Sequence, residues 1–238
     1  MRAVFRIEWR SALARRRLLA WNLIVPLLLL APVAFSPAAA PHRAAVYAVF
    51  FVFFGTFGSA IPLIRDARNG WNEKLLLTGY GVRRWLYERL RAGSSIDIVQ
   101  LIPSVALIGV AAGAGGASIG ALLLALALAL VFANILGVVV AAIVRSLAEG
   151  ALGCAVVALF GLHFAGAFRS APVGSWAELA QRVSPFRPLV EATRSLAAAG
   201  SPPSGAVWLW PLATALLALI LVVLAAPRIA RRLSGAEF

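Results

Sequence analysis

Six long apolar stretches dominate this sequence of 238 residues and restrict the folds that it can adopt. They cover residues 18–35, 44–64, 96–112, 119–144, 152–168 and 206–226. A helix needs about 20 apolar residues to cross the hydrocarbon core of a bilayer, where it satisfies its backbone hydrogen bonds internally. Because 62% of the residues are hydrophobic and 13% are charged, we expect an all-α integral membrane protein with six transmembrane helices.

Lys and Arg residues are unevenly divided between the segments that join these stretches. The N-terminal arm (residues 1–17), the segment 65–97, Arg145 and the C-terminal tail hold 17 of the 22, whereas the segments on the other side hold 5. Lys- and Arg-rich segments of membrane proteins stay in the cytoplasm. We therefore expect a multi-pass protein of the cell membrane, an inner or a plasma membrane, with both termini in the cytoplasm.

The net charge of +13 does not require a nucleic acid as a partner. The Arg residues lie next to apolar stretches rather than on a polar domain, so they orient the chain and contact anionic lipid headgroups. Membrane lipids are expected partners, and nucleic acid is not.

The N-terminal arm has the pattern of an amphipathic helix. Phe5, Trp9 and Leu13 recur at intervals of four residues, and Arg6 and Arg10 follow the same spacing on a neighbouring stripe. This pattern predicts an elbow helix that lies in the membrane interface before the first span. A plain basic anchor without a fixed helix is the alternative.

The segment 65–97 is strongly basic and amphipathic, and it lies between the second and third apolar stretches. It holds 7 of the 22 Lys and Arg residues together with the apolar run Leu75, Leu76 and Leu77. We interpret it as a cytoplasmic loop that offers apolar side chains to a partner protein. A loop helix that packs only on its own subunit is the alternative.

The segment 169–205 is the one sizeable region expected on the outer side. Trp176, Leu179 and Val183 alternate with polar residues at helical intervals, and the sequence from Ser184 to Pro188 then breaks the helix. The pattern predicts two short outer helices that lie at the interface or dip into it. A solvent-exposed loop is the alternative.

Polar groups within the apolar stretches are sparse. The main ones are Asn22, Gln100, Asn134 and His163. No Asp, Glu, Lys or Arg is expected near the centre of any span, so the ionisable groups that proton- or sodium-coupled carriers use are not visible. Gly55 and Gly58 in the second stretch let another helix approach closely, either for packing within the subunit or as the wall of a solute pathway.

The sequence contains no recognisable catalytic constellation. There is no HExxH motif, and the only lysine, Lys74, is preceded by Glu73 and followed by Leu75, so there is no GxxxxGK phosphate-binding loop. The single cysteine, Cys154, excludes an intramolecular disulfide and a Cys-rich metal site. We expect a non-enzymatic chain without catalytic residues, metal or bound cofactor, and energy for transport would come from another polypeptide.

The sequence also contains two short motifs, one after the second apolar stretch and one before the last. Gly70 is followed by Glu73 and by a leucine run that ends in Thr78, and Ser184, Pro185 and Phe186 precede the last stretch. With the order of the spans, they resemble the membrane subunit of ABC-2 type transporters. Those six-span permeases have an elbow helix before span one, a coupling helix after span two and short outer helices before span six.

The sequence also departs from that family pattern in three places. Arg68 stands where the family often has an acidic residue, and Gly79 with Tyr80 replaces a proline that commonly follows the Thr. The segment 36–43 is too short to hold the large outer domain that some relatives insert between spans one and two.

The resemblance implies a single transmembrane domain over residues 1–238 that works as half of a transporter. A second permease subunit, identical or different, would pair with it, and two cytoplasmic ABC ATPase subunits would bind ATP and Mg²⁺. The expected coupling residues are Gly70, Glu73, Lys74, Leu76, Leu77 and Thr78. The candidates for the solute path or the dimer seam are Asn22, Gly55, Gly58, Gly161 and Gly166.

The favoured function is ATP-driven export of a small hydrophobic or amphipathic compound, or of a lipid-linked molecule, because the candidate path is apolar and aromatic. A membrane anchor or sensor subunit that recruits a cytoplasmic partner without transport is the alternative. An intramembrane enzyme would need a nucleophile that the sequence does not offer.

Overall fold

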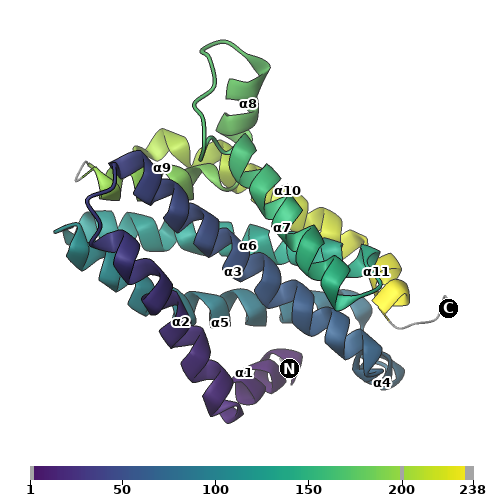
Figure 1. Ribbon diagram of the computed structural model, residues 1–238. Helices are drawn as coiled ribbons and strands as arrows, with labels where there is room; N and C mark the ends of the chain where they lie inside the picture. Colours follow the sequence, from purple (N-terminus) through teal and green to yellow (C-terminus); the bar gives the residue numbers. More distant parts are fainter. Residues whose placement is uncertain (1–2, 199–200, 234–238) are drawn as a thin grey trace.

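The computed structural model describes residues 3–198 and 201–233, and the side chain of Leu76 lies outside the described part. Within these ranges the chain is helical and has no strand (Figure 1). The helices are α1 (Ala3–Ala14), α2 (Arg16–Ala34), α3 (Ala40–Arg68), α4 (Trp71–Leu77), α5 (Val82–Ala111), α6 (Gly116–Ile143), α7 (Leu147–Phe164), α8 (Trp176–Val183), α9 (Arg187–Ala197), the short 3-10 helix η1 (Gly205–Val207), α10 (Leu209–Leu224) and α11 (Ala226–Leu233).

Six of these helices are long and apolar enough to cross a membrane, which confirms the predicted number of spans. They are α2, α3, α5, α6, α7 and the stretch Gly205–Leu224 that ends with α10. Five of them begin and end within five residues of the predicted limits. The chain is therefore a multi-pass membrane protein.

The third span departs from its predicted limits. Helix α5 begins at Val82 rather than at residue 96, so the segment 65–97 is not a loop but the end of α3, the short helix α4 and the first half of α5. The charged residues of this region lower its hydropathy, so the sequence does not indicate a span there. Its apolar residues Trp85, Leu86 and Leu90 are nevertheless buried where α5 meets α1 and α11. Packing therefore extends the helix beyond its apolar part.

Helices α3 and α6 form the centre of the bundle and approach each other closely through small residues. A Cβ atom added at Gly55 of α3 would lie 2.9 Å from the Cβ atom of Ala133 of α6. A Cβ atom added at Gly137 would lie 2.5 Å from the carbonyl oxygen of Thr56. Small residues in membrane helices allow this close packing.

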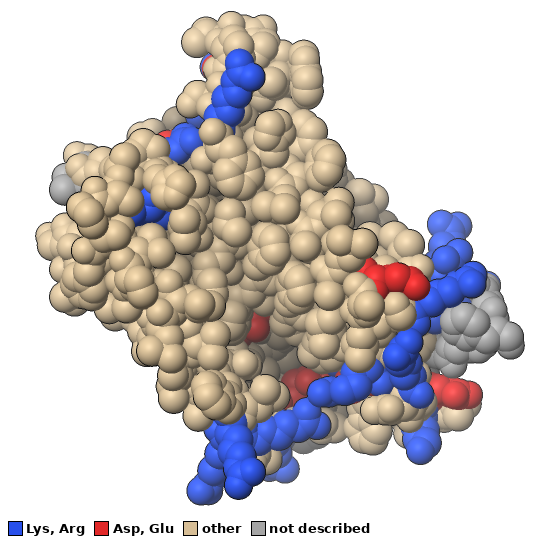
Figure 2. All heavy atoms as spheres, in the orientation of Figure 1, with Lys and Arg blue, Asp and Glu red and all other residues tan. Residues whose placement is uncertain are grey.

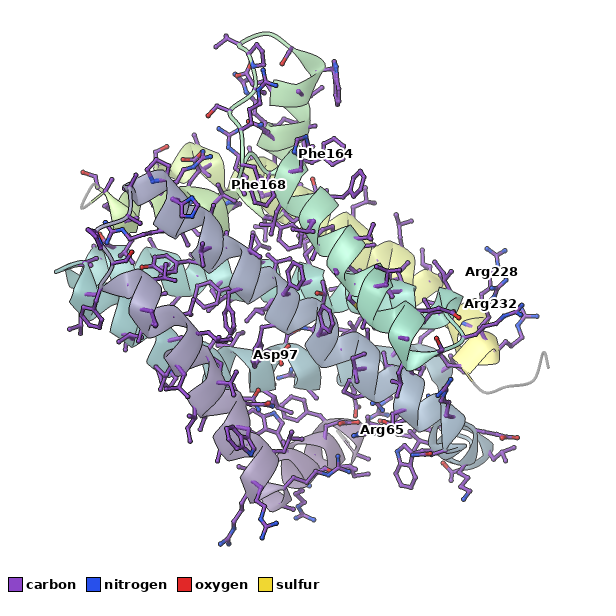
Figure 3. All side chains as sticks on the ribbon, viewed as in Figure 1. Arg65, Asp97, Phe164, Phe168, Arg228 and Arg232 are labelled. Carbon is purple, nitrogen blue, oxygen red and sulfur yellow. The ribbon has the colours of Figure 1, made fainter. Side chains whose placement is uncertain are left out.

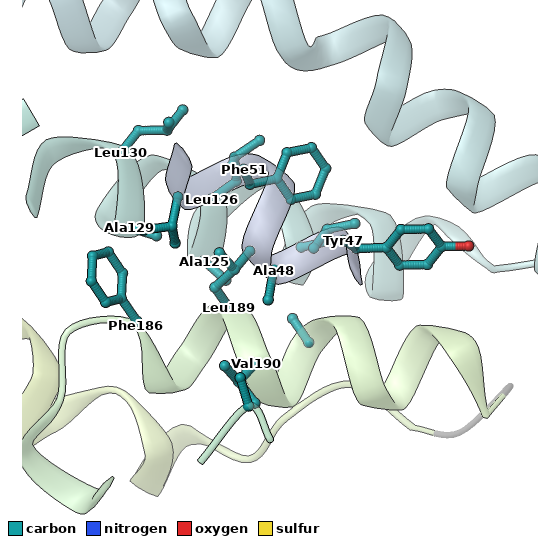
Figure 4. Packing of buried hydrophobic residues seen from close by; sticks show 14 of the residues in the cluster. Tyr47, Ala48, Phe51, Ala125, Leu126, Ala129, Leu130, Phe186, Leu189 and Val190 are labelled. Carbon is teal, nitrogen blue, oxygen red and sulfur yellow. The ribbon is translucent and has the colours of Figure 1, made fainter. Parts of the chain in front are cut away.

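The two short helices before the last span differ in their environment. Helix α9 packs on α3 and α6, and Phe186, Leu189 and Val190 are buried. Figure 4 shows Phe186 and Leu189 on the side of α9 that faces this core. Helix α8 instead projects from the bundle and has no buried residue (Figure 1). Its first turn is capped by Ser175, whose Oγ accepts a hydrogen bond from the Glu178 backbone N–H at 3.2 Å.

Helices α1, α4 and α11 lie at the end of the bundle opposite to α8 and α9 (Figure 1). Most of the Lys and Arg side chains visible in Figure 2 gather at this end, which is called the basic end below. Helix α11 was not anticipated as a separate element. It buries Ile229 and Leu233 and leaves Arg228 exposed.

Candidate functional site

A cavity of about 800 Å³ lies between α1, α2, α3 and α5, in the half of the bundle nearer the basic end. Figure 2 shows it as a hollow with acidic side-chain atoms inside. Apolar side chains such as Phe54 and Phe57 share its wall with polar ones such as Ser59 and Gln100. A volume of this size matches the pockets that hold small organic ligands.

Asp97 lines this cavity and lies near the middle of the 30-residue helix α5 (Figure 3). Its side chain is 5% exposed. The prediction that no charged residue lies near the centre of a span did not anticipate an acidic residue buried within one of the candidate spans. The apolar stretch starts at residue 96, so Asp97 looked like a boundary residue, but the helix continues for several turns before it.

The carboxylate of Asp97 is bound on one side by Asn134 of α6. Asn134 Nδ2 donates to Asp97 Oδ2 at 2.9 Å and to the Leu130 carbonyl oxygen at 2.8 Å. Because both of these partners are acceptors, the amide nitrogen must face them, which fixes the orientation of the Asn134 side chain.

Glycines make room for these two side chains. A Cβ atom at Gly58 of α3 would lie 3.0 Å from Asp97 Oδ1, and one at Gly93 of α5 would lie 2.9 Å from Asn134 Oδ1. Gly58 and Gly93 also line the cavity. Any larger residue at either position would displace the polar pair.

The predicted path residues separate into two groups. Asn22 and Gly58 line the cavity, and Asn22 Nδ2 donates a hydrogen bond of 3.4 Å to Gln100 Oε1. Gly55 instead packs on α6, and a Cβ atom at Gly161 would lie 2.6 Å from the ring of Phe186. These two glycines serve helix contacts within the subunit.

Gly166, the fifth predicted path residue, follows the C-terminus of α7. Its φ angle of +81° is a conformation that L side chains rarely adopt, and the backbone turns there toward the segment that leads to α8. The residue lies outside the cavity lining. The geometry gives it a turn-forming role.

A network of charged side chains borders the cavity toward the basic end. Arg89 of α5, which is 7% exposed, forms ion pairs with Glu8 of α1 at 3.1 Å and with Asp66 of α3 at 2.5 Å. Asp66 also lies 3.6 Å from the guanidinium of Arg65. Each acidic group here has a cationic partner, in contrast to Asp97.

Helix α1 covers Ala3–Ala14 of the predicted elbow region 1–17; residues 1–2 lie outside the described range, and α2 already begins at Arg16. Glu88 of α5 accepts hydrogen bonds from two backbone N–H groups in the first turn of α1, at Val4 (3.1 Å) and Phe5 (3.4 Å). Trp9 Nε1 donates to Ser95 Oγ at 3.1 Å. The helix is thus held against α5, and its location in a membrane interface stays a prediction.

The remaining elbow residues are more exposed. Arg6 and Arg10 are exposed, as is Leu13. The guanidinium of Arg91 on α5 lies 5.2 Å from the ring centroid of Phe5. Two of the three residues of the predicted apolar stripe therefore contact α5, and the third, Leu13, is exposed.

The predicted coupling residues lie on and beside α4, at the basic end. Glu73, Lys74, Leu77 and Thr78 are exposed, and the Leu77 side chain is 79% exposed. Gly70 precedes the helix with a φ angle of +66°. The Leu76 side chain lies outside the described part of the chain, so its environment stays a prediction.

Helix α4 contacts its own subunit through the opposite face. Asn72 is fully buried and Leu75 is half-buried, three residues apart, as on one side of a helix. Helices α3 and α11 are its neighbours. One face is therefore held by the subunit, and the other, which includes Leu77, is left open.

The sequence pointed to Asn134 and Gln100 as polar residues but not to Asp97 as their neighbour. Asp97 and Gln100 are separated by three residues and so share a face of α5. This spacing would have indicated a polar face if the predicted third span had started before residue 96, so that Asp97 lay inside the helix rather than at its end. The pairing with Asn134 depends on which helix packs beside α5, and no spacing in the sequence reports it.

This arrangement can bind a ligand. No group of three or more His, Cys, Asp or Glu side chains suited to a metal occurs among the described residues. The buried polar groups, the apolar walls and the volume together describe a binding cavity within a membrane protein.

A comparison with known protein families identifies the family of this chain. The family model described as ABC-2 type transporter matches residues 1–197. No curated protein matches the chain in sequence. The match covers most of the chain, from α1 to the end of α9, and confirms the family predicted from its motifs.

Members of this family are membrane subunits rather than catalytic ATPases, and they associate with an ABC ATPase subunit. The six apolar helices described above fit that role. The chain therefore belongs to the ABC-2 type transporter family and is a transmembrane permease subunit of an ABC transporter.

Proposed function

We propose that this permease is half of an ATP-driven exporter that moves a small amphipathic compound, or a lipid-linked molecule, out of the cytoplasm. Two permease subunits, identical or different, span the cell membrane, and two ATPase subunits bind beneath them. ATP and Mg²⁺ bind to the ATPase subunits, and this chain binds neither. The basic end faces the cytoplasm, as do both termini, because Lys and Arg residues concentrate there.

The observation that carries this proposal is the exposed apolar surface of α4 at the basic end. Leu77 is 79% exposed and Trp71 is 47% exposed, although both are large apolar side chains. These apolar side chains, with charged Glu73 and Lys74 between them in the sequence, give α4 a surface that a partner protein can cover. In the proposed complex, the ATPase subunit receives Leu77 in a groove.

The position of α4 between two long helices supports a role in coupling. It follows α3 after Asn69 and Gly70, and Thr78 to Gly81 lead from it into α5. Helices α3 and α5 both contribute walls to the cavity. A displacement of α4 by the ATPase subunit would therefore act on two walls of the cavity at once.

The nature of the cavity supports an amphipathic substrate. Phe54, Phe57 and Ile61 present apolar surface, whereas Asn22, Asp97 and Gln100 present polar groups. The cavity reaches from the basic end toward the middle of the bundle, so a compound could enter it from the cytoplasmic half of the membrane. Closure from that side would expel the compound outward.

The test is co-purification of the tagged permease with its ATPase subunit, in mild detergent, with Leu77→Glu as the variant. We expect the variant to lose the ATPase subunit, because a carboxylate without a partner in an apolar groove is destabilising by roughly 2 kcal/mol or more. Val173→Glu is the matched control, since Val173 is 93% exposed on the segment before α8, at the opposite end.

The control should retain the ATPase subunit and substrate-stimulated ATP hydrolysis. If Leu77→Glu and Val173→Glu retain the ATPase subunit equally well, α4 is not part of the interface with that subunit. If no ATPase subunit is recovered even with the unmodified chain, an anchor or sensor role would replace the exporter.

A further inference from the structure

We propose that the cavity recognises a positively charged amine on an amphipathic substrate, and that Asp97 is the residue that binds it. This inference rests on the proposed transport function and names the chemical class of its substrate. It concerns a carboxylate that is buried in a membrane-spanning helix and faces a cavity large enough for an organic molecule. Ionisable residues within membrane spans most often serve a function.

The first observation is that the carboxylate of Asp97 is incompletely paired. Its Oδ2 accepts a hydrogen bond from Asn134, whereas its Oδ1 accepts none from any residue that the structure describes. No Lys, Arg or His among the described residues lies within 4 Å of it to form an ion pair. Arg89, the buried cation beside the cavity, is already paired with Glu8 and Asp66.

The second observation is an unpaired acceptor next to this carboxylate. Asn134 is fully buried, and its Oδ1 has no hydrogen-bond partner. The amide cannot be reversed, because its nitrogen donates to Asp97 and to the Leu130 carbonyl. Asn134 is not part of the cavity lining, so it holds the carboxylate in place while Asp97 itself offers the negative charge to the cavity. An ammonium group has the complementary charge and only donors.

The walls around Asp97 fit the remainder of an organic cation. Phe54 and Phe57 line the same cavity, and aromatic faces attract cations as well as apolar groups. Ser59 and Gln100 add hydroxyl and amide oxygens. A divalent metal ion would need about six oxygen ligands, and the one carboxylate here suits a monovalent ammonium better.

A purely structural role makes a different prediction. If Asp97 served only to join α5 to α6 through Asn134, an Asn at this position would serve as well, since its Oδ1 also accepts a hydrogen bond. The variant Asp97→Asn therefore keeps the hydrogen bond and the shape, and it removes the charge. Loss of amine binding in this variant would therefore show that binding depends on the negative charge of Asp97 and not on its shape or hydrogen bond.

The experiment measures binding of dansylcadaverine, a fluorescent primary amine with an apolar ring system, to the full-length permease in lipid nanodiscs. N-acetyl dansylcadaverine is the neutral probe with the same body, and empty nanodiscs correct for partition into lipid. We expect the permease to bind the amine at least about tenfold more tightly than the neutral probe.

Asp97→Asn should abolish this preference, and Asp97→Glu should retain part of it. Glu149→Gln is the control, because it removes an exposed carboxylate of α7 that lies outside the cavity lining. The control should keep the preference for the amine. Elution volume in size exclusion checks that each variant is folded.

Equal binding of the two probes to the unmodified permease would overturn the inference, as would a preference that survives Asp97→Asn. Equal losses in Asp97→Asn and Glu149→Gln would also overturn it, since they would indicate a general charge effect. Binding is measured without the ATPase subunit, so its outcome is independent of the co-purification test. If the permease prefers the amine but recruits no ATPase subunit, the exporter proposal fails and the amine-binding inference stands.

Discussion

Buried charged side chains in this permease occur in two different settings. Arg89 is surrounded by Glu8 and Asp66 at hydrogen-bonding distances, so its charge is compensated within the subunit. Asp97 has one amide partner and no cation among the described residues. A buried charge is unfavourable unless it is paired. The first setting therefore stabilises the fold, and the second is suited to a ligand.

Replacement of Arg89 by Ala should destabilise the permease by about 3 kcal/mol, because it leaves two carboxylates without their shared partner. The free energy of unfolding in mixed micelles, followed by tryptophan fluorescence, is the measurement. Arg83→Ala is the control, since Arg83 is exposed on the same helix, and its effect should stay within about 0.5 kcal/mol. Similar losses in both variants would show that the network contributes nothing specific.

Between whole helices, small residues decide which pairs can come close. Gly55 and Gly137 bring α3 and α6 into contact across the centre of the bundle. Gly58, one turn from Gly55, faces Asp97 instead. The same helix thus uses two glycines of similar appearance for two purposes, one for packing and one to leave room beside a carboxylate.

Gly137→Ala should weaken the contact between α3 and α6. The new Cβ atom would lie 2.5 Å from the Thr56 carbonyl oxygen, so the backbones must separate, with an expected loss of about 1–3 kcal/mol. Gly120→Ala is the control on the same helix, because no atom lies within 4 Å of its Cβ position. It should leave stability unchanged or raise it by up to about 1 kcal/mol.

Thermal inactivation of the purified permease compares the two alanine variants under identical conditions. A lower midpoint for Gly137→Ala than for Gly120→Ala is the expected order. The reverse order would mean that α3 and α6 do not meet through this glycine.

The molecule as a whole has two unlike ends. Most of the visible Lys and Arg side chains gather around α1, α4 and α11, whereas α8 projects from the other end with exposed Val173 and Trp176 near it (Figure 2). Helix α8 also carries Glu178 and Arg182, so this projection is amphipathic. The asymmetry fits a protein that presents a protein-binding surface on one side of a membrane and an amphipathic projection on the other.

The orientation can be tested with cysteine labelling, because the native Cys154 is fully buried and should not react. Val173→Cys should react with a membrane-impermeant maleimide in right-side-out vesicles. Arg83→Cys should react only in inside-out vesicles, since positively charged segments stay in the cytoplasm. The opposite pattern would invert the topology and, with it, the assignment of the α4 surface to an ATPase partner.

The number of spans, the family and the two short helices after α7 follow from local features of the sequence. Hydropathy is a property of neighbouring residues, so six stretches of sufficient length can be recognised without any knowledge of contacts. The Ser184–Phe186 motif is likewise local, and Phe186 proved to be an anchor of the buried core. The solute path and the α4 partner surface remain predictions.

The start of α5, the separate helix α11 and the environment of Asp97 depend on contacts between distant segments. Residues from Val82 onward are too charged to be recognised as part of a span, and only packing against α1 and α11 buries their apolar face. Asn134 meets Asp97 because α6 packs beside α5. Hydropathy adds up the free energies of transferring single residues into lipid, so it contains no information on contacts. The pairing of buried polar groups depends on which helices pack together in the assembled bundle.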